Sequence, residues 1–444
     1  MRKKNVIERV LSLFTEMRPG EAGTALLLTL NVFLLLTTYY IIKPVREALI
    51  LAGGGAEVKS YAAAGQALLL LGAVPIYALL ASRFSRRKLI NTVTIFFIGC
   101  LAAFYILAKA NTPHIGVVFF LWVGIFNLMV IAQFWSFAND VYTPDEGKRL
   151  FAIVAFGASL GAVLGSVITK YMTGILDVNE LLLLAGAILF ASLVITNLVD
   201  SRERGKAAVR AASKSAVADA DAPIGKNGAF GLVLKNRYLF LIALMILFLN
   251  WVNTTGEYIL GRTVADAAAK AVAAGAAGVV DEKEFIKNFY AEFFGVVNLV
   301  GLLVQLFLVS RILKYLGVRI AILFLPVIAL GGYGLLAFYP ILSAVRWAKT
   351  AENATDYSLQ NTVRNVLFLP TTREQKYKAK QAIDTFFVRA GDVLSAALVF
   401  AGTNWLAFKT QQFAMVNIAL VVVWLVLAVM IGRESRKLAA AATA

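Results

Sequence analysis

Apolar residues run through the chain in long, nearly uninterrupted stretches, separated by short segments rich in charge, glycine or proline. A helix needs about 20 mostly apolar residues to cross the hydrocarbon core of a bilayer. Twelve stretches meet this requirement: 22–50, 61–81, 89–108, 114–138, 150–174, 181–199, 237–260, 288–310, 320–339, 341–363, 381–405 and 413–432. The pattern therefore predicts an all-α integral membrane protein with twelve transmembrane helices, whose main environment is the lipid bilayer.

The composition excludes several classes of protein. Of the 444 residues, 60% are apolar and only 16% are charged, whereas a soluble chain carries about 25% charged residues. The single cysteine excludes an intrachain disulfide, and the single histidine excludes a site with several histidine ligands. The sequence contains neither a GxxxxGK[ST] loop nor a GxSxG elbow. It therefore predicts a protein that is not an enzyme and needs no cofactor or metal.

The distribution of lysine and arginine predicts the orientation in the membrane. With the N-terminus in the cytoplasm, 29 of the 43 cations fall in cytoplasmic segments and 7 fall in outer loops. This imbalance places both termini inside, because cytoplasmic loops carry the excess of lysine and arginine. Topology thus accounts for most of the net charge of +17, and no nucleic-acid partner is predicted. The start of the chain shows no cleavable signal, and we expect a monomer.

A stretch without large apolar residues, 201–230, divides the spans into six and six. Ser136 and Ser358 occupy corresponding positions in the segments FWSFAND and DYSLQN, which end the fourth and tenth spans, and Glu47 and Glu257 precede similar apolar residues. This order suggests an internal duplication. Two such six-helix bundles describe the major facilitator fold. The predicted regions are a leader at 1–20, a bundle at 21–200, a linker at 201–235, a second bundle at 236–433 with an outer-surface segment at 263–287, and a tail at 434–444.

Seven cations remain inside the predicted spans: Lys43, Arg46, Lys170, Arg346, Lys349, Arg364 and Arg389. A charge at the bilayer centre is costly, so such residues line a cavity, pair with each other, or lie near a span end. In the first span, Lys43, Arg46 and Glu47 share one helix face. In the tenth span, a stripe within about 80° of arc consists of Arg346, Lys349, Asn353, Asp356, Gln360 and Arg364.

Other polar groups fall in or beside the spans. Glu257 follows Asn253 in the seventh span, and Asp140 closes the fourth. The eleventh span carries Asp384, Arg389 and Asp392, which are expected to pair as a gate. Anchoring at the headgroups and satisfied structural clusters remain alternatives for several of these groups. If the internal cations share one cavity, its field favours a polyvalent anion such as a phosphate ester.

Three ordered segments resemble one known family. They are YYIIKPVREALIL in the first span, FWSFANDVYTPDEGKRLFAIVAFGASLG from the fourth, and DYSLQNTVRNVLFLPTTREQKYKAKQAIDTFFVRAGD from the tenth. They are similar to segments of the ATP/ADP translocases, the nucleotide transporters of plastids and intracellular bacteria. The resemblance implies a major facilitator fold, nucleotide transport, often as exchange, and a location in the bacterial inner membrane.

The resemblance also assigns individual residues. Arg46 and Arg364 match essential lysines of that family, and Glu257 matches its glutamate in the seventh span. The sequence departs from the family pattern where Leu260-Gly261-Arg262 replaces a Trp-Lys pair and where Gln360-Asn361 replaces an Asp-Pro pair. These departures leave the choice of nucleotide, or of another anionic metabolite, open.

We therefore predict an alternating-access carrier for a phosphorylated anion, with a nucleotide as the leading candidate. The residues predicted to bind substrate are Lys43, Arg46, Lys349, Asn353 and Arg364, with Tyr39, Tyr40, Asn253 and Tyr357 toward a base or sugar. Those predicted to couple or gate are Glu47, Glu257, Asp356, Asp140, Asp384, Arg389 and Asp392. One alternative is a proton-coupled symporter or exporter of a non-nucleotide solute, in which Glu47, Glu257 or Asp356 carries the proton. Another is a non-transporting membrane subunit.

Overall fold

The computed structural model describes residues 8, 17–142, 144–172, 175–210, 229–275, 281–368, 371 and 379–443. This part of the chain is helical and contains no strand, which confirms the all-α prediction. Ten helical stretches within it are long and apolar enough to cross a membrane. The predicted spans at 22–50 and 61–81 are counted once because they share one helix, and the span at 341–363 is divided among three shorter helical segments.

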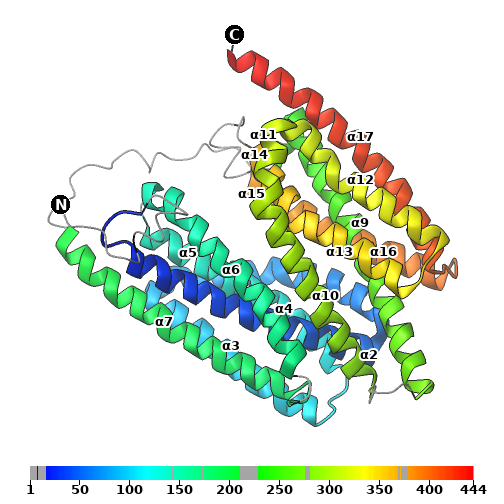
Figure 1. The fold of residues 1–444 in the computed structure, drawn as a ribbon, viewed down its shortest axis with the longest axis horizontal. Helices are drawn as coiled ribbons and strands as arrows, with labels where there is room; N and C mark the ends of the chain where they lie inside the picture. Colours follow the sequence, from blue (N-terminus) through cyan, green and yellow to red (C-terminus); the bar gives the residue numbers. More distant parts are fainter. Residues whose placement is uncertain are drawn as a thin grey trace. The chain divides into compact units, whose positions relative to one another are not determined.

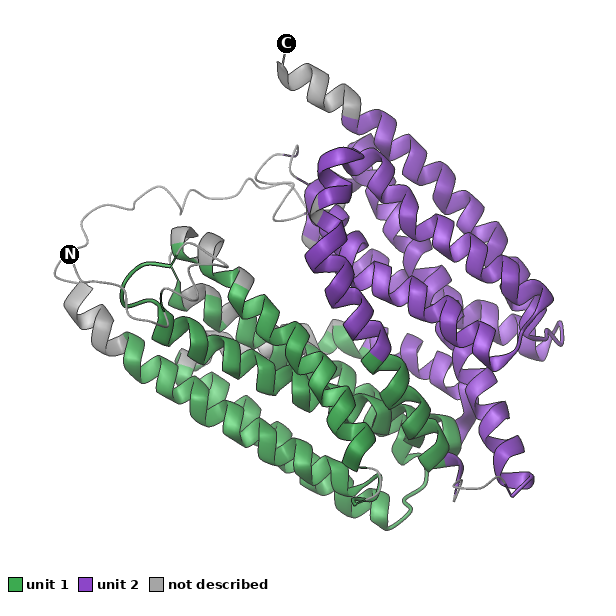
Figure 2. Ribbon diagram, viewed as in Figure 1, with its two compact units in different colours: residues 1–53, 69–220, 283–295 green, residues 54–68, 221–282, 296–444 purple. Residues whose placement is uncertain are grey.

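The chain forms two compact units, coloured separately in Figure 2. Unit 1 comprises Met1–Gly53, Leu69–Ala220 and Lys283–Gly295, and unit 2 comprises Gly54–Leu68, Asp221–Glu282 and Val296–Ala444. Each unit therefore contains a short segment from the half of the chain that mainly builds the other unit. These two captured segments are 54–68 in unit 2 and 283–295 in unit 1.

The described part of the first half of the chain contains six α-helices, labelled in Figure 1, and one π turn. The α-helices are α2 (Ala22–Arg83), α3 (Arg86–Lys109), α4 (Ile115–Phe126), α5 (Ala132–Val141), α6 (Pro144–Met172) and α7 (Glu180–Arg210), and the π turn is η1 (Asn127–Ile131). Within unit 1, α3 lies along α7. Much of the core is aromatic, and the ring of Trp122 stacks on Phe119 and Phe126 at centroid distances of 5.5 and 5.6 Å.

The second half is built from more, and shorter, helical pieces. They are α8 (Ala229–Lys235), α9 (Arg237–Ala273), α10 (Glu282–Val304), η3 (Gln305–Val309), α11 (Ser310–Tyr315), α12 (Gly317–Phe338), α13 (Leu342–Thr355), η4 (Asp356–Gln360), α14 (Asn361–Leu367), α15 (Lys380–Ala382), η6 (Ile383–Phe387), α16 (Val388–Asn404) and α17 (Thr410–Thr443). In unit 2, α12 lies along α17, and α9 packs against α13, α16 and α17. The π turns interrupt the helices beside several predicted site residues, and such turns often occur at functional sites.

A single glycine joins the first two predicted spans. Helix α2 continues for 62 residues, with a non-helical backbone at Gly55 (φ 75°, ψ −177°). A positive φ costs glycine little, so one residue is enough to redirect the helix. Lys59 is one of the seven cations that the sequence assigns to outer loops, and this assignment is wrong, because the helix resumes directly after the kink and Lys59 is buried within it.

Close contact between α2 and α6 depends on three glycines of α6 spaced four residues apart. A Cβ atom at Gly157, Gly161 or Gly165 would collide with a backbone carbonyl oxygen of α2, at Thr29, Phe33 or Thr37 respectively. The sequence pattern GxxxGxxxG predicts this kind of close helix packing, and the structure confirms it.

The structure describes only part of the predicted leader and linker, and its helices cross several of the predicted boundaries. The leader at 1–20 is outside the described residues except for Glu8 and 17–20, and most of the linker at 201–235 is outside them as well. Helix α7 reaches Arg210, so the linker begins as a continuation of the sixth span. Helix α9 extends through 263–273 of the predicted surface segment, and α17 extends into the predicted tail.

Candidate functional site

A buried lysine lies at the centre of unit 2. Lys349 is placed by α13 and is fully buried. Its ammonium nitrogen Nζ donates to Asn253 Oδ1 at 2.8 Å and lies 3.1 Å from Glu352 Oε2 and 3.7 Å from Glu257 Oε1. A buried ammonium group is stable only when it is paired and hydrogen-bonded. Lys349 therefore joins α13 to α9 through the Glu257 carboxylate and the Asn253 amide, and it also pairs with Glu352 on its own helix.

Glu257 is the most accessible carboxylate of this cluster, with a side chain 26% exposed. Its Oε1 accepts a hydrogen bond of 3.0 Å from Asn353 Nδ2, and its Oε2 lies 3.9 Å from Lys59 Nζ. Lys59 belongs to the captured segment 54–68, whose Glu57 also accepts a hydrogen bond of 2.9 Å from Tyr258. The described contacts of Glu257 with Lys349 and Lys59 are longer than the 3.1 Å contact between Glu352 and Lys349.

Glu352 and Tyr333 complete the cluster, and the sequence pattern did not identify either of them. Tyr333 is buried in α12, and its hydroxyl donates to Glu352 Oε2 at 2.9 Å. Glu352 is itself buried, three residues after Lys349. The opposite charges at this spacing in α13 were an available signal, since side chains at i and i+3 are neighbours on a helix. Nothing in the sequence indicated Tyr333, which reaches the cluster from another helix.

Gly256 of α9 makes room for this arrangement, which leads to a first prediction. A Cβ atom there would collide with Tyr333 Oη and lie 3.0 Å from Lys349 Nζ. Gly256→Ala should therefore destabilise the protein by about 1–3 kcal/mol, the usual cost of overpacking, and lower its melting temperature in a thermal-shift assay. Gly331→Ala is the matched control, because a Cβ atom at that position in α12 meets no atom within 4 Å. Equal melting temperatures for the two variants would contradict the prediction.

The predicted cation Arg364 lies in α14 and pairs with the predicted gate residue Asp384. Its Nη2 donates to Asp384 Oδ1 at 3.0 Å, and Lys380 Nζ lies 2.5 Å from Asp384 Oδ2. One carboxylate thus serves two cations, and the Arg364 side chain remains 25% exposed. Asp356 lies at the start of η4 and is partly buried, whereas Tyr357 is exposed.

A separate ionic group joins α16 to α9. Asp392 is buried and accepts hydrogen bonds from Asn250 Nδ2 and Thr254 Oγ1, both at 2.8 Å. Arg389, three residues earlier on α16, donates to its other oxygen at 3.0 Å. The predicted pair Arg389–Asp392 is therefore present, and the two α9 side chains satisfy the rest of the carboxylate. Asp140 lies in α5, and its side chain is outside the described part of the chain.

The predicted residues of the first span gather in unit 1. Lys43 is buried, and its Nζ lies 3.8 Å from the ring centroid of Phe294, 5.1 Å from that of Tyr40 and 5.8 Å from that of Tyr39. A cation within about 6 Å of aromatic ring faces is attracted by their quadrupoles. Phe294 comes from the captured segment 283–295. The two tyrosines therefore contact the ammonium group of Lys43 directly.

Arg46 and Glu47 form an ion pair one turn further along α2. Arg46 Nε donates to Glu47 Oε1 at 3.0 Å, and a second guanidinium nitrogen contacts the same oxygen. The guanidinium carbon also lies 4.8 Å from the ring centroid of Phe120. Glu47 is almost fully buried, while the Arg46 side chain is 14% exposed. Arg46 is therefore the more accessible partner of this pair.

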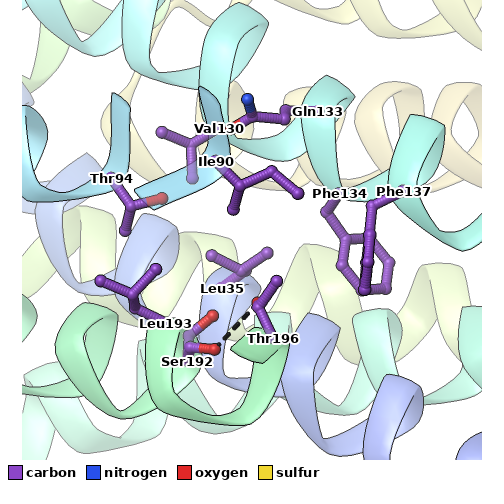
Figure 3. Close-up of a pocket in the computed structure, with 10 residues that line it drawn as sticks. All are labelled: Leu35, Ile90, Thr94, Val130, Gln133, Phe134, Phe137, Ser192, Leu193 and Thr196. Atoms are coloured by element: carbon purple, nitrogen blue, oxygen red, sulfur yellow. Dashed lines mark hydrogen bonds between the residues drawn. The ribbon is translucent and has the colours of Figure 1, made fainter. Parts of the chain in front are cut away.

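Figure 3 shows a small internal cavity of unit 1, lined by residues that include Gln133, Thr94, Ser192 and Thr196. Thr196 Oγ1 donates to the Ser192 carbonyl at 3.0 Å, and the buried Gln133 Nε2 has no hydrogen-bond partner among the described residues. The free volume is about 20 Å³. This is enough for about one water molecule and far too small for a nucleotide. The cavity is therefore too small to be the binding site of a nucleotide-sized solute.

A family model described as Major Facilitator Superfamily matches residues 27–354. The chain belongs to the major facilitator superfamily. This family places it among membrane transporters and not among enzymes. No group of three or more potential metal ligands is found in the part of the chain that the structure describes.

Two relatives support the similarity to ATP/ADP translocases that the three sequence segments indicate. ADP,ATP carrier protein 1 of Chlamydia pneumoniae is 22% identical over 372 residues, covering 73% of this chain and 65% of that protein. ADP,ATP carrier protein 3 of Rickettsia typhi is 21% identical, covering 68% and 64%. The predicted resemblance to ATP/ADP translocases is thus confirmed. The chain spans less than two thirds of the length of the curated relatives it matches.

Solved transporter structures share the fold. The nucleoside transporter NupG has a TM-score of 0.61 at 12% identity, with 92% of this chain and 98% of that chain covered. A POT family transporter in complex with 5-aminolevulinic acid also has a TM-score of 0.61, at 14% identity, with coverages of 93% and 96%. At such identities the likeness concerns the fold alone.

Proposed function

We propose that this superfamily member is an alternating-access carrier for a phosphorylated anion, and that the anion is a nucleotide. The observation that carries the proposal is a set of cations on apolar helices, each held by carboxylates or aromatic rings. In unit 2 these cations are Lys349, Lys59 and Arg364, and in unit 1 they are Lys43 and Arg46. The similarity to proteins named ADP,ATP carrier supports a nucleotide within the broader class of anions.

The charge balance of the central cluster suggests how an anion enters. Two cations, Lys59 and Lys349, face two carboxylates, Glu257 and Glu352. A neutral cluster is stable without substrate, but a polyanion needs net positive charge. Glu257 has the longest ion contacts of the set and is partly exposed, so its carboxylate is the one that a phosphate group replaces. Lys349, buried and tightly paired, then positions Glu257 and is not the first contact of the phosphate.

Arg46 and Arg364 are the proposed direct phosphate contacts. Both guanidinium groups are partly exposed; Arg46 pairs with Glu47, and Arg364 pairs with Asp384. A guanidinium group binds phosphate oxygens in a bidentate manner, which a lysine cannot do. Lys43 and Asn353 are assigned supporting roles, and Tyr39, Tyr40, Asn253 and Tyr357 are assigned to the base or sugar.

The finer architecture belongs to the same proposal. It comprises twelve spans in two six-helix bundles, a bacterial inner-membrane location, both termini in the cytoplasm and a monomeric state. The 62 residues of α2 support two crossings in place of one, since a single crossing needs about 20 residues. Reporter fusions at the two termini test the orientation, and opposite locations for them would contradict it.

The captured segments are proposed to release during the transport cycle, and one ion pair offers a test. Lys170 Nζ of α6 lies 3.0 Å from Glu292 Oε1 in the segment 283–295. With Cys100, the only cysteine, replaced by alanine, cysteines at 170 and 292 can be joined by a short reducible cross-linker. We expect the cross-link to stop uptake in proteoliposomes and a reductant to restore it.

The control for this experiment carries the same cross-linker on either single-cysteine variant, and its uptake should not change. If the doubly cross-linked protein transports at the uncross-linked rate, the segment 283–295 does not need to leave α6, and the release step is wrong. Neither result bears on the identity of the substrate, which the uptake assay tests separately.

That assay measures uptake of labelled ATP and ADP into proteoliposomes, with unlabelled nucleotides, phosphate esters and uncharged nucleosides as competitors. Uptake that is stimulated by nucleotide inside the vesicle supports exchange. The buried carboxyl of Glu47 favours one alternative, proton-coupled transport of another solute. Uptake abolished by a protonophore and unaffected by nucleotides would establish that alternative. Purification in a fixed stoichiometric complex, without uptake of any anion, would instead support a non-transporting subunit.

A further inference from the structure

A surface groove lies between two neighbouring helices of unit 2, away from the ion cluster. It is formed by the start of α12 and the end of the apolar part of α17, and its free volume is about 620 Å³. Its lining residues are Leu316, Val318, Arg319, Ile320, Leu323, Gly432 and Ser435. The candidate spans containing these helices are Gly317–Phe338 and Thr410–Ser435, so the groove lies at the end of both spans. This level of a membrane protein faces lipid headgroups.

One charged side chain enters this otherwise mostly apolar groove. Arg319 is exposed and has no hydrogen-bond or ion-pair partner within the described part of the chain. Its aliphatic stem lies on Gly432, where a Cβ atom would be only 2.9 Å from Arg319 Cγ. The glycine thus lets the arginine lie against α17. Beside the guanidinium group, Leu316 and Ile320 are 44% and 45% exposed, and they provide an apolar wall.

From this juxtaposition we infer that the groove binds an anionic glycerophospholipid. The phosphate would pair with the Arg319 guanidinium, and Ser435 would offer a hydroxyl to the headgroup. An acyl chain would lie along Leu316, Ile320 and Leu323 toward the bilayer core. A free anion would use the guanidinium but leave the apolar wall exposed. Basic pockets between helices at the cytoplasmic face are known sites for anionic headgroups, and the cation distribution predicts that this end is cytoplasmic.

Native mass spectrometry of the purified full chain, incubated with equal amounts of phosphatidylglycerol and phosphatidylcholine, tests the inference. We expect phosphatidylglycerol to be retained about fivefold over phosphatidylcholine, as one interfacial arginine would give. Arg319→Gln should remove this preference. Arg433→Gln is the matched control, because Arg433 is exposed and adjacent to Gly432 but does not line the groove.

Three outcomes would overturn the inference. In the first, Arg319→Gln keeps the preference, and in the second, both variants lose it equally, which would indicate a diffuse basic surface. In the third, inorganic phosphate displaces phosphatidylglycerol from the wild-type protein, which would indicate a site for a free anion. A monodisperse elution profile for Arg319→Gln ensures that the comparison uses folded protein. None of these outcomes depends on the transported solute.

Discussion

Replacing Lys349 by methionine is expected to cost the protein about 3–5 kcal/mol of stability, the usual penalty for removing one partner of a buried ion pair. The substitution leaves the buried carboxylate of Glu352 with only the Tyr333 hydroxyl as a donor among its described contacts. A large fall in melting temperature, or loss of monodisperse protein, should follow. The measurement is a thermal-shift assay on purified protein, with melting temperatures compared at one scan rate.

The double variant Lys349→Met, Glu352→Gln provides the control. It removes both charges, and a glutamine at 352 can still accept the hydrogen bond from Tyr333. We expect it to recover most of the lost stability, because removing a whole buried pair is often nearly neutral. Glu352→Gln alone should lie between the two, since Lys349 keeps Asn253 and Glu257 as partners. A double variant no more stable than Lys349→Met would show that Glu352 does not depend on Lys349 for its charge.

The same variants separate folding from transport. If Lys349 positions Glu257, the double variant should be stable and yet transport poorly, because Glu257 loses its 3.7 Å cation contact. Transport at the wild-type rate would mean that Asn353 and Lys59 are enough to hold Glu257. We therefore expect the double variant to regain stability without regaining transport. If the cluster were purely structural, the double variant would regain both.

Long apolar runs made most of the fold predictable, because a span needs little more than length and hydrophobicity. The prediction failed where a single residue sets the geometry. The run of glycines near Gly55 indicates a loop, yet only Gly55 leaves the helical conformation, and Lys59 consequently lies inside a helix. The π turns η3, η4 and η6 were also unpredictable, since they add a residue to a helical turn without a sequence signature.

The sequence predicted which site residues share a face of one helix, but it did not predict which residues of different helices contact each other. Spacing placed Lys43, Arg46 and Glu47 on one face of the first span, and in the structure Arg46 pairs with Glu47 while Lys43 lies against Phe294. The partners from other helices, such as Phe294 beside Lys43 and Tyr333 beside Glu352, depend on tertiary packing that no local pattern encodes. The sequence also did not show which of these cations a solute could reach. In the structure, the Lys349 side chain is 1% exposed and the Arg364 side chain is 25% exposed.

Replacing Arg46 or Arg364 by glutamine is expected to reduce nucleotide uptake by roughly 10- to 100-fold for each variant, which corresponds to the loss of one charge-assisted hydrogen bond worth about 1.5–3 kcal/mol. The melting temperature should change little for Arg364→Gln, because both side chains of that pair are partly exposed. It should fall for Arg46→Gln, because the buried carboxylate of Glu47 loses its arginine, so uptake is compared at equal amounts of folded protein. Initial rates of labelled ATP uptake in proteoliposomes measure the effect, with Arg433→Gln as a control for the loss of an exposed positive charge. Wild-type uptake by both glutamine variants would remove these arginines from the substrate site.

Two further substitutions distinguish phosphate binding from a role in holding the gate. Arg46→Lys and Arg364→Lys introduce the lysine that the ATP/ADP translocases carry at the matching positions. They keep the positive charge and lose only the bidentate geometry, so their uptake should exceed that of the glutamine variants and remain below that of the wild type. Asp384→Asn frees Arg364 from its ion pair at 3.0 Å. If Arg364 binds phosphate, this variant should bind nucleotide at least as tightly as the wild type. If the pair with Asp384 is the whole function of Arg364, Asp384→Asn should lose as much uptake as Arg364→Gln, and the assignment of Arg364 to the phosphate would be wrong.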